Sequence, residues 1–336
     1  MTRNASHLHS ARVARADEFY TRRGTIEKEM AFHRTSFRGK AVHCCCDDPY
    51  RSAFVEYFID HFADLGLARL EATNHVDSGT LLFDLSEDRP WHLCVTTVPD
   101  GVHGIDELVR CDGNSMECLR GDGDFRSAEV RKIMRGCDVV VTNPPFSLMR
   151  DFLDVVGREQ VDLLCLATSM VPVLSTVFRR FQRREWWIGE SIHSGGTQFT
   201  IPEDYDSSRA ASCGRDEHGS FIRVTGIRWI SSLDEPHVSL KLTASYDPDR
   251  YPTLDGVDAI HVDRLSEIPK DFGGVMAVPI TFLDVWDVNQ FEVIGMLGGA
   301  ASLVGDIPHT VDDPIVNGEC KFKRILIRRR DMPATP

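Results

Sequence analysis

Apolar and polar residues alternate along the chain in a way that predicts strands and helices from residue 17 onwards. Residues 1–16 show no periodicity, so we expect a flexible arm there. Over residues 21–32, apolar and charged residues recur at helical spacing, and Thr25 is a candidate cap for the start of this helix. The organised part of the chain is therefore expected to begin with a helix.

The next segments predict a parallel crossover. They are a buried strand at 40–46, an amphipathic helix at 52–65 and a second strand at 67–73. A strand, a helix and a strand in this spacing form a right-handed unit with parallel strands. We therefore expect an open α/β sheet.

An insertion is predicted after this crossover, over residues 76–118. It holds two strand-like pieces, 80–85 and 91–98, which we interpret as a hairpin. Helices and strands then alternate again, which is typical of a doubly wound sheet. The predicted elements are helices at 128–135 and 148–156, strands at 138–142 and 161–167, and a late strand pair at 186–192 and 227–231.

The second half of the chain is predicted to contain a flexible loop and a smaller region. Trp186, Trp187 and Trp229 are expected in the core, because tryptophan buries a large area. Residues 207–220 are polar and contain glycine, which favours a flexible loop. After about residue 234, short strands alternate with Pro and Gly, so we expect a mixed, strand-rich region over 235–336.

The strand at 138–142 runs directly into Asn143, Pro144, Pro145 and Phe146. Both prolines lack an N–H and hold φ fixed, which makes the loop stiff and leaves its carbonyls to accept hydrogen bonds. The Asn143 side-chain oxygen and the Pro144 carbonyl can converge on one amino group, while Phe146 offers an aromatic face. A base taken out of a duplex fits this arrangement. Asn-Pro alone is an ordinary turn, but the full pattern favours catalysis.

The turn after the first strand is a candidate cofactor site. It holds Cys46, Asp47 and Asp48, where a nucleotide-binding fold usually carries glycines, and no G-x-G-x-x-G pattern is present. The two carboxylates can meet a cationic amino group, or they can cap the helix that follows. Both roles stay open.

Composition fits a globular enzyme. The chain has 336 residues, of which 42% are hydrophobic, enough for one large or two ordinary domains. No apolar run approaches the ~20 residues of a membrane helix, and no secretion signal begins the chain, so we expect a cytoplasmic protein without a membrane partner. The 10 cysteines include no C-x-x-C pair, which favours reduced thiols. No metal is predicted at His43 and Cys44 to Cys46, because alternate residues of a strand face opposite sides.

The net charge of −13 argues at first against a nucleic-acid partner. The basic residues are clustered, however, whereas the acids are spread along the chain. Each basic cluster can follow a phosphate backbone or can be a solvated helix face or charged tail, which is the commoner case. The candidate DNA contacts are Arg179, Arg180, Arg183, Arg184, Lys321, Lys323, Arg324 and Arg328.

The order of several motifs resembles the EcoRI-type adenine-specific DNA methyltransferases, and the resemblance is nearly end to end. The Asn-Pro-Pro-Phe tetrapeptide is similar to the catalytic motif of S-adenosylmethionine-dependent enzymes that methylate adenine N6. The other motifs are Asp17-Glu-Phe-Tyr-Thr21, Cys46-Asp-Asp-Pro49, Gly121-Asp-Gly-Asp-Phe125, Val278-Pro-Ile-Thr-Phe-Leu-Asp284 and Lys323-Arg-Ile-Leu-Ile-Arg328. The resemblance implies a Rossmann-like methyltransferase domain over 17–234 and a DNA recognition region over 235–336.

The resemblance also implies a reaction, a cofactor and partners. S-adenosylmethionine would give its methyl group to the N6 amine of a flipped adenine in duplex DNA, in restriction–modification or in an orphan or phage modification role. A cognate restriction endonuclease would share the DNA site without binding this chain. The implied catalytic residues are Asn143, Pro144, Pro145 and Phe146, and the implied cofactor contacts are Tyr20, Thr21, Cys46, Asp47, Asp48, Asp124, Phe125 and Asn143.

Three other functions stay open. An RNA adenine or a protein glutamine amide would present a planar NH₂ to the same acceptors, although the basic C-terminal segment favours DNA. A non-catalytic DNA-binding relative would keep the fold, but the intact tetrapeptide argues for chemistry. A nucleotide-binding dehydrogenase is disfavoured by the missing glycine pattern.

Overall fold

The structure is a computed structural model that describes residues 20–76, 89–102, 104–193, 195–201, 212–235, 240–298, 302, 307 and 309–332. The arm predicted at 1–16 and the strand predicted at 80–85 lie outside the described residues. The chain divides into two compact units. The first comprises Met1–Ser169 and Gly189–Asp234, and the second comprises Met170–Ile188 and Glu235–Pro336.

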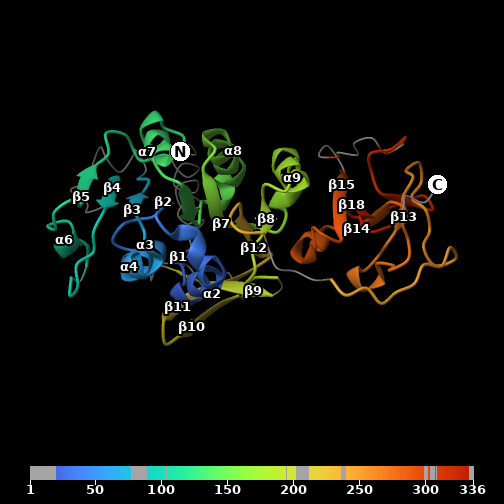
Figure 1. The fold of residues 1–336 in the computed structure, drawn as a ribbon, viewed down its shortest axis with the longest axis horizontal. Helices are drawn as coiled ribbons and strands as arrows, with labels where there is room; N and C mark the ends of the chain where they lie inside the picture. The colour runs from blue at the N-terminus through green and yellow to red at the C-terminus, as the bar shows by residue number, and fades with distance from the viewer. Residues whose placement is uncertain are drawn as a thin grey trace, which may run out of the picture. The chain divides into compact units, whose positions relative to one another are not determined.

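A large mixed sheet has the strand order β5-β4-β3-β2-β6-β7-β12-β8 (Figure 1). Its strands are β2 (Ala41–Cys45), β3 (Arg69–Thr73), β4 (Trp91–Val95), β5 (Ser115–Cys118), β6 (Val139–Thr142), β7 (Asp162–Thr168), β8 (Trp187–Ile188) and β12 (Ile227–Ser231). Strands β3, β2, β6 and β7 are parallel, whereas β4, β5 and β12 pair antiparallel. The predicted α/β class is confirmed.

Helices cover both faces of this sheet, which explains why β2 and β6 are buried along their whole length. The helices are α2 (Arg23–His33), α3 (Ala53–Asp60), α4 (Phe62–Leu65), α6 (Ile105–Leu108), α7 (Ala128–Arg135) and α8 (Met149–Glu159). The crossovers from β2 to β3 and from β6 to β7 run in opposite directions. Right-handed crossovers in opposite directions place their helices on opposite faces, and Figure 1 shows α3 and α8 on different sides of the strands.

Capping explains which helix boundaries the sequence predicts. The Ser52 hydroxyl accepts hydrogen bonds from the N–H groups of Phe54 and Val55 at 3.1 and 3.5 Å and so begins α3. The predicted helix over 52–65 forms as α3 and α4, with a break at His61. The prediction that Thr25 caps the first helix was wrong. Helix α2 begins at Arg23, and the side chain of Arg22, the residue before it, makes no capping hydrogen bond.

A second sheet in the first unit has the order β1-β9-β11-β10. Its strands are β1 (Tyr20–Thr21), β9 (Gly196–Thr200), β10 (Cys213–Asp216) and β11 (Gly219–Thr225). The flexible loop predicted over 207–220 was wrong for its second half, which forms the β10 and β11 hairpin. Strand β10 is polar because it lies at the exposed edge of this sheet.

The second unit contains a four-stranded sheet, β13-β14-β18-β15, and a separate hairpin. Its elements are α9 (Ser175–Gln182), β13 (Ile260–His261), β14 (Met276–Pro279), β15 (Phe291–Leu297), β16 (Ile315–Val316), β17 (Glu319–Cys320) and β18 (Arg324–Arg329). Strand β18 lies between β14 and β15, and Ile325, Leu326 and Ile327 are fully buried. The basic C-terminal segment is therefore a central strand and not a charged tail.

Short 3₁₀ helices complete the two units. They are η1 (Arg34–Phe37), η2 (Phe146–Leu148), η3 (Val171–Val173), η5 (Leu265–Glu267) and η6 (Ile280–Val285). Trp186, Trp187 and Trp229 are buried, which confirms their predicted place in the core. In the described part of the chain, none of the helices has the length and apolar character required to span a bilayer.

Candidate active site

The strand order of the large sheet reverses between β2 and β6. The chain passes from β2 to β3 on one side and from β6 to β7 on the other. In open α/β sheets, ligands bind outside the carboxyl ends of the strands at such a switch point. The turn of Cys46, Asp47 and Asp48, called the acidic turn below, follows β2, and Asn143 follows β6. The fold therefore places both predicted segments at this point.

Buried hydrogen bonds hold the three neighbouring strand ends together. The Thr142 hydroxyl, at the end of β6, donates to the Cys45 carbonyl at the end of β2. The Asp47 N–H donates to the Thr73 carbonyl at the end of β3, at 2.8 Å. Thr142 and Thr73 are fully buried. These hydrogen bonds to neighbouring strands thus fix where the loops after β2, β3 and β6 begin.

Cys46 makes the sharp turn that a glycine usually makes at this position. Its φ is +67°, in the left-handed region, which costs a residue with a side chain about 1–2 kcal/mol. Asp48 then orders the turn, because its carboxylate accepts from the Tyr50 N–H at 2.8 Å and its carbonyl accepts from the Ser52 N–H at 2.9 Å. A strained non-glycine turn therefore takes the place of the missing glycine pattern.

The Asp47 carboxyl group is buried at the end of β2, with 7% of the residue exposed. One oxygen accepts from the Ser52 hydroxyl at 2.7 Å, and the other has no hydrogen-bond partner among the described residues. Burial raises the pKa of this carboxyl to about 7, although the hydrogen bond from Ser52 opposes the shift. A buried carboxyl with a spare oxygen fits a cationic ligand group.

The loop before α7 is packed against the end of β3. Gly123 has a φ of +80°, and a Cβ at this position would lie 1.9 Å from the Asn74 carbonyl oxygen. The Val76 N–H donates to the Asp122 carbonyl at 2.8 Å and ties the two segments together. This close approach requires glycine and brings Asp124 to the same sheet edge as Asp47.

Asp124 and Phe125 are already engaged within the chain. The Asp124 carboxylate accepts from the Arg126 guanidinium at 2.6 Å, and this hydrogen bond lowers its pKa. Phe125 is 3% exposed, and its ring packs against Phe152 at a centroid distance of 5.4 Å. Their contact with the cofactor stays a prediction.

Replacing Gly123 by Ala is expected to destabilise the first unit. A left-handed alanine costs about 1–3 kcal/mol, and the clash with the Asn74 carbonyl adds to that cost. The measurement is the free energy of unfolding in urea. Gly121→Ala is the control, because a Cβ there meets only Glu129 Oε2 at 3.7 Å. Equal stability of the two variants would contradict the close approach.

The Asn143 loop presents one carbonyl and one ring. The Pro145 carbonyl accepts from the Leu148 N–H at 3.0 Å, whereas no hydrogen bond to the Pro144 carbonyl occurs within the described residues. The half-buried Phe146 ring meets Phe199 of β9 edge-on, with a centroid distance of 6.2 Å. Of the two proline carbonyls, the one predicted to accept from the substrate therefore has no hydrogen-bond partner in the described part of the chain, and Pro144 itself is buried.

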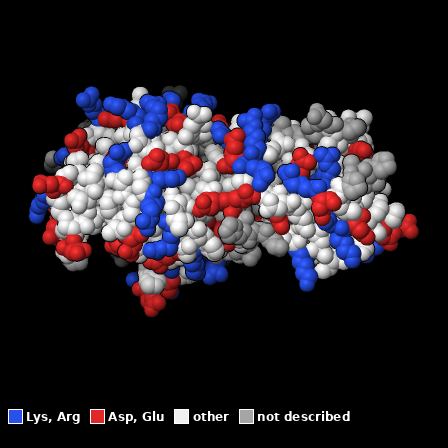
Figure 2. Space-filling view, in the orientation of Figure 1, with Lys and Arg blue, Asp and Glu red and all other residues white. Residues whose placement is uncertain are grey.

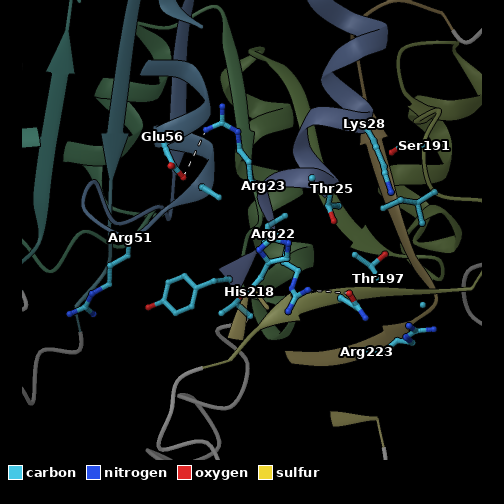
Figure 3. Close-up of a pocket in the computed structure, with 18 residues that line it drawn as sticks. Arg22, Arg23, Thr25, Lys28, Arg51, Glu56, Ser191, Thr197, His218 and Arg223 are labelled. Atoms are coloured by element: carbon cyan, nitrogen blue, oxygen red, sulfur yellow. Dashed lines mark hydrogen bonds and ion pairs between the residues drawn. The ribbon is translucent and has the colours of Figure 1, made fainter. Parts of the chain in front are cut away.

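Tyr20 and Thr21 form β1, which pairs with β9. Thr21 is 7% exposed, and its hydroxyl has no hydrogen-bond partner among the described residues. Both residues line a cavity of about 810 Å³ that Arg51, next to the acidic turn, also lines (Figure 3). Tyr20 and Thr21, which the sequence predicts to be cofactor contacts, therefore line a cavity of the structure.

The basic cluster around α9 is largely neutralised by nearby acids. Arg180 lies 2.7 Å from Glu185, and Arg184 lies 3.0 Å from Glu235. Arg183 has a longer contact with Glu185, at 4.0 Å. Arg179 is exposed and makes no ion pair in the described part of the chain. Figure 2 likewise shows acidic side chains among the basic ones over the visible face.

The second basic cluster is split between core and surface. Arg324 is 7% exposed, and its guanidinium donates to the Phe322 and Lys323 carbonyls at 2.9 and 3.4 Å. Burial lowers the pKa of Arg324, and this position argues against a phosphate contact. Lys321 lies 2.7 Å from Glu319, and Arg328 lies 3.1 Å from Glu292. Lys323 is half-buried. DNA contacts from this cluster stay a prediction.

No group of three or more His, Cys, Asp or Glu side chains suited to a metal ion occurs among the residues that the structure describes. His43 is fully buried in β2, and its Nε2 lies 2.9 Å from the Thr73 hydroxyl. Burial lowers the pKa of His43 to about 3. His43 is therefore a neutral imidazole in the core and has a structural role.

Sequence reasoning missed Glu29, which fixes one wall of the cavity. Its carboxylate is fully buried and accepts from the N–H groups of Glu190 and Ser191 at 2.9 and 2.7 Å. A Cβ at Gly189 would lie 2.1 Å from Glu29 Oε1, so the segment can approach only through a glycine. No local motif marks this pair, because the partners are 161 and 162 positions away in the sequence.

Comparison with known proteins identifies the family. Residues 7–330 match the family model described as adenine-specific methyltransferase EcoRI. The chain belongs to this family. The adenine-specific methyltransferase EcoRI family was the one that the motif order resembled, so that prediction is confirmed.

Relatives of this chain align with it over nearly the full length of both sequences. The Type II methyltransferase M.EcoRI of Escherichia coli is 34% identical and is matched over 98% of this chain and 99% of its own. The Type II methyltransferase M.MpnI of Mycoplasma pneumoniae is 29% identical, over 96% and 98%. M.MgeORF184P of Mycoplasma genitalium is 27% identical, over 97% and 99%. No solved structure matches the chain.

Proposed function

We propose that this protein is a site-specific DNA methyltransferase that transfers a methyl group from S-adenosylmethionine to the N6 amine of an adenine flipped out of duplex DNA. The observation that carries the proposal is the Asn143-Pro144-Pro145-Phe146 loop at the carboxyl end of β6, beside the switch point, in a member of an adenine-specific methyltransferase family. Two acceptors and an aromatic ring match the amine and the flat ring of adenine.

The two units receive different roles in this proposal. The first unit is the Rossmann-like methyltransferase domain, supported by the switch point between β2 and β6. The second unit, which begins its main segment at Glu235, is the DNA recognition region. Phosphate contacts would position the duplex there, and base contacts would specify the site. The protein would act in the cytoplasm, and a cognate endonuclease would share its site.

The chain supplies orientation and hydrogen bonding to the reaction. Adenine N6 is a weak nucleophile, because its lone pair is delocalised into the ring. Hydrogen bonds from the two N6 hydrogens to Asn143 Oδ1 and the Pro144 carbonyl favour a pyramidal nitrogen and expose the lone pair. Phe146 holds the ring by stacking. Alignment of the amine accounts for most of the acceleration, and the proton leaves afterwards to water.

The residues at the switch point fit the proposed cofactor. When bound, S-adenosylmethionine supplies an electrophilic methyl group on a sulfonium. The spare, buried Asp47 oxygen suits its cationic amino group. The other contacts, proposed from the resemblance, are Tyr20, Thr21, Cys46, Asp48, Asp124, Phe125 and Asn143.

The test is transfer of labelled methyl from S-adenosylmethionine to unmethylated genomic DNA, with the product mapped by single-molecule sequencing. Methylated adenine at one short motif would establish the activity and reveal the site. Transfer to RNA or to a protein glutamine, with none to DNA, would instead support the alternatives in which the same loop holds another planar NH₂ group. Cofactor binding without any transfer would favour a non-catalytic relative.

Replacing Phe146 by Ala is expected to lower kcat/KM for DNA by roughly 5- to 150-fold, because base stacking contributes about 1–3 kcal/mol. Phe146→Tyr keeps the ring and should retain most of the rate. Steady-state methylation of the mapped site measures the effect, and thermal unfolding checks the lost contact with Phe199. A Tyr variant as slow as the Ala variant would argue against stacking.

A further inference from the structure

The cavity of about 810 Å³ in the first unit has a strongly basic lining. It lies between the start of α2, the turn before α3 and strands β9 and β11 (Figure 3). Figure 3 shows Lys28, Thr197 and Arg223 together on one side and Arg51 on another. The charged residues that line it are Arg22, Arg23, Lys28, Arg51, Arg223 and Glu56, with His218 beside them.

The cationic side chains differ in whether acids already neutralise them. Arg22 lies 2.6 Å from Asp216, and Arg23 lies 2.9 Å from both Glu27 and Asp60. Lys28 and Arg223, in contrast, are exposed and make no ion pair within the described ranges. Their charges come from α2 and β11 and are available to an anionic ligand.

Backbone and hydroxyl groups of the cavity also favour an anion. Arg23, Gly24 and Thr25 form the first turn of α2, which has no side-chain cap and no acidic residue. The Thr25 N–H donates to the Arg22 carbonyl at 2.9 Å, so among the described residues the Arg23 and Gly24 N–H groups and the helix dipole are left to attract negative charge to this terminus. The Thr21 hydroxyl adds an independent sign of a ligand, because it is buried and unpartnered among the described residues and lines the cavity.

The reaction offers two kinds of anion, the phosphates of DNA and the carboxylate of the cofactor. The cofactor carries one carboxylate against an ammonium and a sulfonium, so its net charge is positive, and surplus positive charge repels it. A DNA strand carries one negative charge at each phosphate. The cavity volume and the separated charges of Lys28 and Arg223 therefore fit phosphates better than they fit a single carboxylate.

We propose that this cavity binds phosphates of the DNA strand that carries the target adenine, through Lys28, Arg223 and the first turn of α2. The strand is chosen because Arg51 joins the cavity to the acidic turn at the switch point, and a flipped base stays attached to its own backbone. The inference rests on the proposed function and adds a DNA contact outside both basic clusters of the sequence.

The test compares two double variants with equal loss of charge. Lys28→Gln with Arg223→Gln removes the cavity cations. Lys132→Gln with Arg158→Gln removes two exposed cations from the last turns of α7 and α8, at the sheet edge opposite Asn143. Binding of a duplex with the mapped site is measured over a salt series. The cavity variant should bind more weakly, and its log–log salt slope should fall by about 1.4–1.8. Cofactor affinity by calorimetry should not change.

A second measurement identifies the phosphates. Neutral methylphosphonate linkages beside the target adenine should weaken binding to the unchanged protein but add little to the loss in the cavity variant, because both changes remove one interaction. Weaker cofactor binding in the cavity variant would assign the cavity to the carboxylate and overturn the proposal. DNA binding equal to that of the control would overturn it too.

The outcomes also separate this inference from the proposed function. If the unchanged protein methylates DNA while the cavity variant binds the duplex normally, only the phosphate site is wrong. If the unchanged protein neither binds nor methylates DNA, the DNA methyltransferase function itself is wrong, and the phosphate site is wrong with it.

Discussion

Replacing Asn143 by Ala is expected to lower the rate of methyl transfer by about 10²–10³-fold, the usual effect of removing one preorganised hydrogen bond to a reacting group. The Asn143 amide follows β6 at the switch point, so its position is set by a buried strand. Without it, only the Pro144 carbonyl accepts from the N6 amine. The measurement is single-turnover methylation of the mapped DNA site with saturating cofactor.

Two further variants separate chemistry from folding. Asn143→Asp keeps an oxygen acceptor and should be faster than the Ala variant, whereas Ser147→Ala changes an exposed residue beyond the ring of Phe146 and should leave the rate unchanged. The midpoint of thermal unfolding should stay the same in all three, and saturating cofactor keeps the proposed contact of Asn143 with the cofactor from limiting the measured rate. An Ala variant with nearly full activity would show that the loop does not hold the amine.

The fold was predictable where a local signal and a buried pattern coincide. The helix expected at 128–135 forms with these bounds, because the Ser127 hydroxyl accepts from the Val130 N–H at 3.2 Å and Gly136 follows its last turn. The start of α2 was missed because Arg22 provides no such cap. The apolar run of β6 and the two prolines likewise predicted that the Asn143 loop begins where a strand ends.

Charge was harder to interpret from the sequence, because ion pairs join residues far apart in the chain. Arg184 meets Glu235, 51 positions away, and Arg22 meets Asp216, 194 positions away. A run of basic letters therefore says little about free charge. Arg324 begins the central strand β18. The apolar residues that follow it do not alternate with polar ones, because the strand is buried on both faces, so the sequence shows no strand pattern there. The basic cavity draws its residues from separate segments, and no linear motif contains them.

Replacing Asp47 by Asn is expected to weaken cofactor binding by roughly 100-fold, since removing one member of a buried charged pair costs about 2–5 kcal/mol. Cofactor binding to the unchanged protein should also depend on pH. The carboxyl pKa of about 7 means that the group is mostly protonated at pH 6 and mostly ionised at pH 8, so affinity for a cationic group should rise about tenfold between them. Calorimetry over this range measures both effects, and the Asn variant should show no such rise.

The same substitution is expected to stabilise the ligand-free protein at alkaline pH. The folded pKa of about 7 lies above the ordinary value of 3.8, so the folded state binds the extra proton between these values and loses stability as the pH rises from about 4 to about 7. Asn keeps the acceptor for the Ser52 hydroxyl but cannot ionise, and this part of the pH dependence should vanish. Asp112→Asn is the matched control, because Asp112 is exposed and makes no ion pair in the described part of the chain. An Asp47→Asn protein that is less stable than the unchanged one at pH 8, with normal cofactor affinity, would make Asp47 a purely structural residue. If the Asp47→Asn protein is more stable at pH 8 and binds the cofactor more weakly, Asp47 lowers the stability of the ligand-free protein but is needed for cofactor binding.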